Sequence, residues 1–109
     1  MWMACTAWLA WMGVALAGPY EDGVAALKTG DLVSARSLLT AAVEANPKHV
    51  RAHWELGWAH WVAEDLAATA RAWAAVEALD GSLEDVGFWR QAAATRAALA
   101  AVEVTLPEV

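Results

Sequence analysis

Apolar residues recur at helical spacing after residue 18, and four short polar breaks divide them into five runs. The breaks are Gly30-Asp31, Asn46-Pro47, Glu64-Asp65 and Asp80-Gly81. Glycine just past a helix and aspartate just before one are typical of helix ends, and proline disfavours helix in the residue before it. No run alternates strictly as a half-buried strand does. The pattern predicts an all-α fold of five antiparallel helices, the last three at about 48–63, 64–79 and 83–102.

Two of these breaks are similar in sequence and recur along the chain. Gly30-Asp31-Leu32 and Glu64-Asp65-Leu66 are separated by about 34 residues, and each precedes a run of similar length. We call the distance from Gly30 to Glu64 the repeat period. A helix pair that recurs at such a period indicates a stack of repeats, in which each pair packs on its neighbours.

Particular residues recur within the repeat. The second pair reads His53-x-x-Leu56-Gly57-x-x-His60 and then Thr69-x-x-x-Trp73, followed by Gly81, while the first pair has Ala35-x-x-x-Leu39, Ala42 and Pro47. In these positions the chain resembles the tetratricopeptide repeat (TPR) family, whose unit is a helix-turn-helix of the same length. The match is poorer at both ends. Pro19 and Asp22 replace the family's Trp and Leu, and Trp89-x-x-Ala92-Ala93 matches only with a two-residue insertion.

The resemblance covers about residues 19–99 and implies antiparallel helix-turn-helix repeats, a TPR-like α-solenoid of about two units plus a C-terminal capping helix. We expect this domain at residues 18–103 and a tail at 104–109. Because about three repeats are needed to bury a continuous core, we expect the last helix, a partner or self-association to complete the stack.

Residues 1–17 carry no charged side chain and end in Ala15-Leu16-Ala17, a pattern that signal peptidase accepts. The run is shorter than the roughly 20 apolar residues of a membrane span. It predicts a signal peptide and a periplasmic or secreted protein. An uncleaved membrane anchor is the alternative, because no Lys or Arg precedes the apolar run. Cys5 is the only cysteine and lies in this run, so neither disulfides nor a reactive thiol are expected after cleavage.

The charge and the motifs exclude several functions. The net charge is −6, and the seven Lys and Arg are scattered singly, which argues against nucleic-acid binding. The sequence contains no nucleophile elbow, phosphate-binding glycine loop or H-E-x-x-H motif. We therefore expect neither an enzyme nor a bound cofactor.

Trp54, Trp58 and Trp61 are the candidate partner-binding residues, since spacings of four and three place them on one helix face. The resemblance implies that these positions, flanked by Arg51 and Val62, line a groove that holds a partner peptide. It also implies that Arg51 and Arg90 pair with acidic groups of the partner. The alternative is that the N-terminal helix or a second copy covers the Trp stripe as core.

His49, His53, His60 and Glu64 include two pairs spaced by four, which can hold a metal. The resemblance gives His53 and His60 packing positions instead, so no metal site is predicted. The sequence thus predicts a protein-protein interaction adaptor or scaffold that binds an unidentified protein or peptide. Alternatives are a structural subunit of a larger exported or membrane-associated assembly, and a metal or small-ligand module using the histidines. Membrane contact is expected only if residues 1–17 stay uncleaved, and a homo-oligomer is possible.

Overall fold

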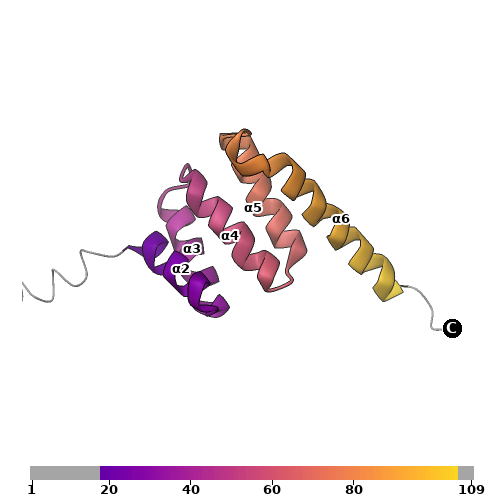
Figure 1. Ribbon diagram of the computed structural model, residues 1–109, viewed down its shortest axis with the longest axis horizontal. Helices are drawn as coiled ribbons and strands as arrows, with labels where there is room; N and C mark the ends of the chain where they lie inside the picture. The colour runs from indigo at the N-terminus through magenta and orange to yellow at the C-terminus, as the bar shows by residue number, and fades with distance from the viewer. Residues whose placement is uncertain (1–17, 106–109) are drawn as a thin grey trace, which may run out of the picture.

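The computed structural model describes residues 18–105, which form five packed α-helices and no strand (Figure 1). This confirms the predicted all-α fold and the number of helices. The predicted signal peptide or anchor at 1–17 and the last four residues of the predicted tail lie outside the described residues. The helices are α2 (Pro19–Thr29), α3 (Leu32–Ala45), α4 (Val50–Val62), α5 (Leu66–Leu79) and α6 (Val86–Thr105), with a 3-10 turn η1 (Leu83–Asp85) before α6.

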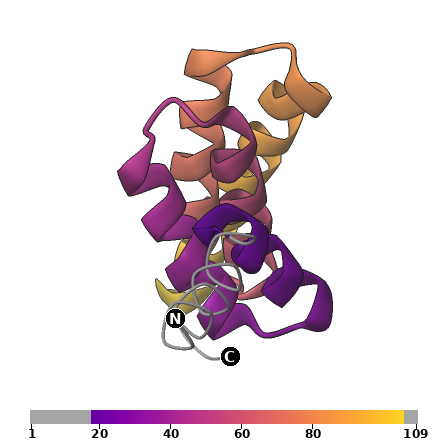
Figure 2. The same ribbon diagram turned by 90° about the vertical axis from the view of Figure 1, so that its left-hand side faces the viewer.

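The helices pack in chain order, so that each lies against the next. The stack begins with α2 and ends with α6, and Figure 2 looks along it from the α2 end. The last helix continues to Thr105, past the end predicted near 102 and into the predicted tail. The sequence offers no helix breaker before Pro107, so nothing local ends the helix at 103.

The turn after α2 and the turn after α4 have the same structure and are separated by one repeat period. Gly30 and Glu64 both have a positive φ, 84° and 63°. Asp31 and Asp65 each donate a backbone N–H to the carbonyl five residues earlier, at 2.9 Å in both turns. Their carboxylates then accept the N–H three residues later and cap the following helix. Glu64 thus lies in the turn and not in the first turn of α5, where the sequence had predicted it.

The packing inside each helix pair repeats at the same distance. A Cβ at Gly23 would lie 2.7 Å from Cγ of Leu39, and a Cβ at Gly57 would overlap the indole of Trp73. Gly23 precedes Gly57 by one repeat period, and Leu39 precedes Trp73 by the same distance. In both pairs the missing side chain on the first helix lets a large side chain of the second helix approach closely.

The last helix follows the same register. Val86 and Ala93 of α6 are buried, and they lie one repeat period after Ala52 and Ala59, which are buried on α4. α6 therefore packs on α5 with the face that α4 turns to α3, and the two-residue insertion assumed from the sequence is not needed. The distortion lies in η1, where Glu84 and Asp85 have positive φ, so that α6 starts later without turning its face.

We expect Gly57→Ala to lower the free energy of unfolding by about 2 kcal/mol, because a methyl group overpacks the contact with the Trp73 indole. Urea denaturation followed by far-UV circular dichroism measures this. Gly87→Ala on α6 is the matched control, since its Cβ would meet only the flexible end of the Glu77 side chain, at 2.9 Å. Equal stability of the two variants would contradict the requirement for glycine at position 57.

Candidate functional site

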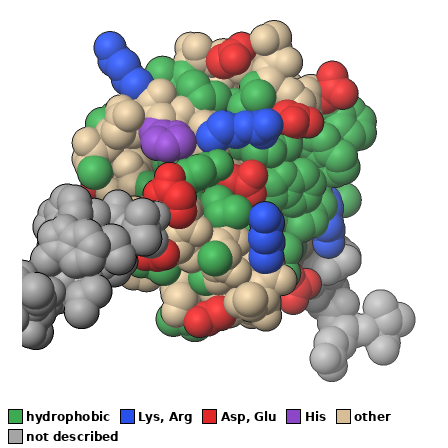
Figure 3. Space-filling view, turned by 60° about the vertical axis from the view of Figure 1, so that its left-hand side comes forward, with side chains coloured by type: hydrophobic (Ala, Val, Ile, Leu, Met, Phe, Trp, Pro, Cys, Tyr) green, Lys and Arg blue, Asp and Glu red, His purple; other side chains and the backbone are tan. Residues whose placement is uncertain are grey.

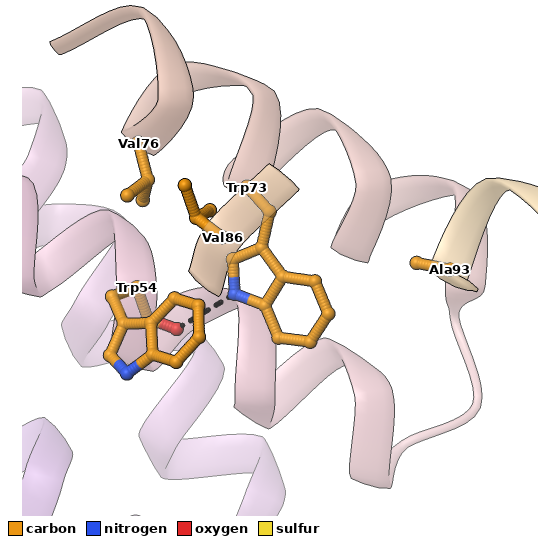
Figure 4. Close-up of a cluster of buried hydrophobic side chains, with 5 residues drawn as sticks. All are labelled: Trp54, Trp73, Val76, Val86 and Ala93. Carbon is orange, nitrogen blue, oxygen red and sulfur yellow. Dashed lines mark hydrogen bonds between the residues drawn. The ribbon is translucent and has the colours of Figure 1, made fainter. Parts of the chain in front are cut away.

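The predicted Trp stripe of α4 lies inside the molecule. Trp54 is only 6% exposed, and Trp58 and Trp61 are half-buried against the core. Trp73 of α5 donates its Nε1–H to the backbone oxygen of Trp54 at 3.2 Å (Figure 4). The groove expected at Trp54 is therefore not present there, because α5 and α6 cover it. The stripe packs against α5 and α6, whereas the sequence had named the N-terminal helix or a second copy as its cover.

Trp58 is the centre of a cluster of tryptophans from three helices. Its ring centroid lies 5.6 Å from Trp54, 4.8 Å from Trp73 of α5 and 5.3 Å from Trp89 of α6. The three contacts are edge-to-face, the arrangement that aromatic quadrupoles favour. Trp61 completes the cluster at 5.7 Å from Trp73. The α4 stripe thus contacts α6 through Trp89, while α6 packs mainly on α5.

The two predicted arginines are engaged in ion pairs within the chain. Arg51 lies 3.5 Å from the carboxylate of Glu84, which joins the start of α4 to η1. Arg90 donates to Glu77 at 2.9 Å and joins α6 to α5. Both pairs are partly exposed, so each contributes little to stability. Val62, the remaining predicted residue, is 56% exposed at the end of α4.

The face of α6 that corresponds to the Trp stripe is uncovered. Phe88, Ala92 and Thr95 lie one repeat period after Trp54, Trp58 and Trp61. Phe88 is 66% exposed, and within the described residues no helix follows α6 to cover it. A shallow hollow lies on this face, lined by Phe88, Gln91, Ala92, Thr95 and Arg96. We call these five residues the open face of α6.

Every residue of the open face has a counterpart on α4. Gln91 follows Gly57 by one repeat period, and Arg96 follows Val62 by the same distance. The guanidinium of Arg96 lies 4.9 Å from the centroid of Trp61, where the ring attracts a cation. Leu99, 58% exposed, extends the apolar surface by one turn. The sequence analysis missed this face, although the repeat period gives its position directly.

Charged side chains lie beside hydrophobic surface on the face shown in Figure 3. Glu55 is a half-buried residue of α4, and burial raises its pKa above the ordinary value. Arg51 and Lys28 oppose that shift, and Glu84 adds to it. Burial also raises the pKa of Tyr20 on α2, and Glu55 adds to that shift.

The three histidines are held apart by separate hydrogen bonds. Nδ1 of His49 accepts the Ala52 N–H at the start of α4, and Nε2 of His53 lies 2.8 Å from the Pro47 oxygen. Nδ1 of His60 accepts from Nε of Arg36 at 3.2 Å. Within residues 18–105 no three His, Cys, Asp or Glu side chains gather in a way that could hold a metal ion.

Arg36 joins the first helix pair to the second. It extends from α3 to His60 of α4 and also donates to Asp65 at 3.1 Å, in the turn between α4 and α5. Burial, and then the charge of Arg36, lower the pKa of His60. Protonation of His60 removes the acceptor for Arg36 and brings two positive charges together.

Comparisons add no relative to this picture: no protein-family model, curated protein or solved structure matches the chain. None of the helices within residues 18–105 combines the length and the apolar character that crossing a bilayer requires. Function is therefore inferred from the geometry of the chain itself.

We expect Trp54→Ala to lower the free energy of unfolding by about 3–5 kcal/mol, because the buried ring fills the space between α4 and α5. Val62→Ala, at an exposed position of the same helix, is expected to change it by less than about 0.5 kcal/mol. Urea denaturation followed by far-UV circular dichroism compares the two. An equally small loss of unfolding free energy in both variants would contradict the burial of the Trp stripe.

We expect acid to weaken the fold through His60. Its pKa in the folded chain lies below the ordinary value of 6.5, so between the two values the unfolded chain binds a proton that the folded chain excludes. The free energy of unfolding therefore decreases as pH falls from 6.5 toward the lowered pKa. Thermal melts from pH 7.5 to 5 measure the slope, and His60→Gln reduces it. An unchanged slope in that variant would assign the effect to other groups.

Proposed function

We propose that the chain is a protein-binding module, a TPR-like stack of two helix pairs capped by α6, and that a partner helix or peptide binds on the open face of α6. One observation carries the proposal. The hollow on α6 is lined by the positions equivalent to Trp54, Trp58 and Trp61, which α5 and α6 cover on α4. The face that neighbouring helices cover on α4 is thus exposed on α6.

The open face has the chemistry of a helix-binding surface. Phe88 and Leu99 expose large apolar area, while Ala92 and Thr95 between them are small enough to admit a partner side chain. Amphipathic helices bind such surfaces through a few apolar anchors, and aromatic residues contribute much of the binding energy. Trp89 anchors α6 in the tryptophan cluster, and a surface that is ordered before binding loses less entropy when a partner binds.

The partner-binding surface proposed here differs from the one predicted on α4. In this proposal the partner does not contact Trp54, Trp58 and Trp61, which belong to the cluster that Trp89 of α6 joins. The partner does not pair with Arg51 or Arg90 either, because both form ion pairs within the chain. A metal-binding function has no support in the histidines, each of which is engaged elsewhere. Export remains part of the proposal and places the partner in the periplasmic or extracellular space.

We expect Phe88→Glu to abolish partner capture without unfolding the chain. The charge removes the main apolar anchor at an exposed position, so folding is little affected. The measurement is an affinity capture from the exported fraction, with bound proteins quantified by mass spectrometry. Val33→Glu is the matched control, because Val33 is 82% exposed on α3 at a distance from α6 in the stack.

Two results would contradict the proposal. One is that Phe88→Glu retains every protein that the unchanged chain captures. The other is that Val33→Glu loses the same proteins, which would mean that any added surface charge prevents capture.

A further inference from the structure

We infer that the open face of α6 binds a second copy of this chain, with the two α6 helices antiparallel about a twofold axis that passes between Gln91 and Ala92. The inference rests on the proposed function, because it names the occupant of the same face. Three features of α6 support it: the sizes of the side chains on both sides of this point, the glutamine at the crossing, and the placement of charge.

The open face is self-complementary in shape. Phe88 precedes the axis by the same number of residues by which Thr95 follows it. In an antiparallel pair, Phe88 of each copy therefore enters the hollow beside Ala92 and Thr95 of the other. The same positions of α4 hold Trp58 and Trp61, so the smaller residues on α6 leave the space that a phenyl ring needs. A large residue opposite small ones is the arrangement that fills an interface in both copies at once.

Gln91 excludes one kind of occupant, a helix that packs on α6 as α3 packs on α2 and as α5 packs on α4. At Gly23 and Gly57 the covering helix brings Leu39 or Trp73 into the space of a Cβ. Gln91 fills that space at the equivalent position, so the occupant of α6 must present a small residue at the crossing. The second copy presents Ala92 there. The two Gln91 amides also meet near the axis, where each can donate to and accept from the other.

The charges on α6 are complementary across the same axis. Arg96 follows the axis and lies over Trp61, while the acidic residues Glu84 and Asp85 precede it in η1. Arg96 and Glu84 both lie on the side of α6 that faces α4, since Arg96 lies over Trp61 and Glu84 pairs with Arg51. In an antiparallel pair these sides face each other, so Arg96 of each copy approaches the acidic pair of the other. Opposite charges placed in this way select the antiparallel orientation.

We expect the two copies to associate weakly. α6 has 20 residues and is therefore about 30 Å long, and one helix pair buries less than the roughly 800 Å² per partner of a standard interface. The net charge of −6 on each copy adds repulsion, and salt reduces that repulsion. The dimer is thus expected to depend on concentration.

Sedimentation velocity of the full chain over a wide range of concentration tests the inference. We expect a shift from monomer to dimer and, for Phe88→Glu, a dissociation constant about tenfold higher or more, because the central anchor is lost. Val33→Glu is expected to leave the constant unchanged. Because every variant carries residues 1–17, association through that segment would be the same in all of them and would not produce this difference.

A charge exchange tests the geometry. Arg96→Glu and Asp85→Arg are each expected to weaken self-association, since like charges then meet across the axis. A mixture of the two variants restores it, because each copy supplies the charge that the other needs. Circular dichroism of the single variants checks that both remain folded. Failure of the mixture to associate better than either variant alone would overturn the antiparallel pair.

The remaining outcomes separate this inference from the proposed function. A chain that stays monomeric at every concentration, yet captures another protein in a Phe88-dependent way, overturns the second copy as occupant and leaves the binding module standing. A monomeric chain without Phe88-dependent capture overturns both.

Discussion

The indole of Trp73 occupies the space that a side chain at position 57 would need, and the packing of α4, α5 and α6 depends on this contact. Because Gly57 lets α5 approach α4 so closely, the Trp73 N–H reaches the backbone oxygen of Trp54 and the rings of α4 and α5 meet. The cluster that results is the surface on which Trp89 of α6 packs. The first helix pair uses Gly23 and Leu39 in the same way, with a smaller side chain that has no N–H to donate.

The helices and their period could be predicted because their signals are local. Gly30, Asp31 and Pro47 act on the backbone within a turn of their own positions, so the breaks follow from the sequence directly. The conformation of Glu64 could not be predicted in this way. A positive φ is unusual for glutamate, and the neighbouring helices, which fix the turn, impose it.

The covered face of α4 could not be predicted from α4 itself. Spacing shows that Trp54, Trp58 and Trp61 share a face. Whether that face is exposed to solvent depends on the tertiary packing of α5 and α6, which the spacing does not give. The ion pairs of Arg51 and Arg90 are likewise non-local, joining residues 33 and 13 positions apart. The open face was within reach of the sequence, because the repeat period carries each position of the stripe onto α6. Aligning Trp89 with the family's Trp position required a two-residue insertion, and that insertion shifted the register of α6 and hid the open face.

The substitutions between α4 and α6 show how the end of this stack differs from its middle. Gly57 corresponds to Gln91 and Val62 to Arg96, so α6 is more polar than α4 at these two positions. A cap that served solubility alone would also replace the aromatic position. That position instead keeps a large apolar side chain in Phe88, which exposes two thirds of its surface to water. An exposed ring beside small residues and a cation is costly in a monomer and favourable in a complex, which is the physical argument for the proposal that α6 has an occupant.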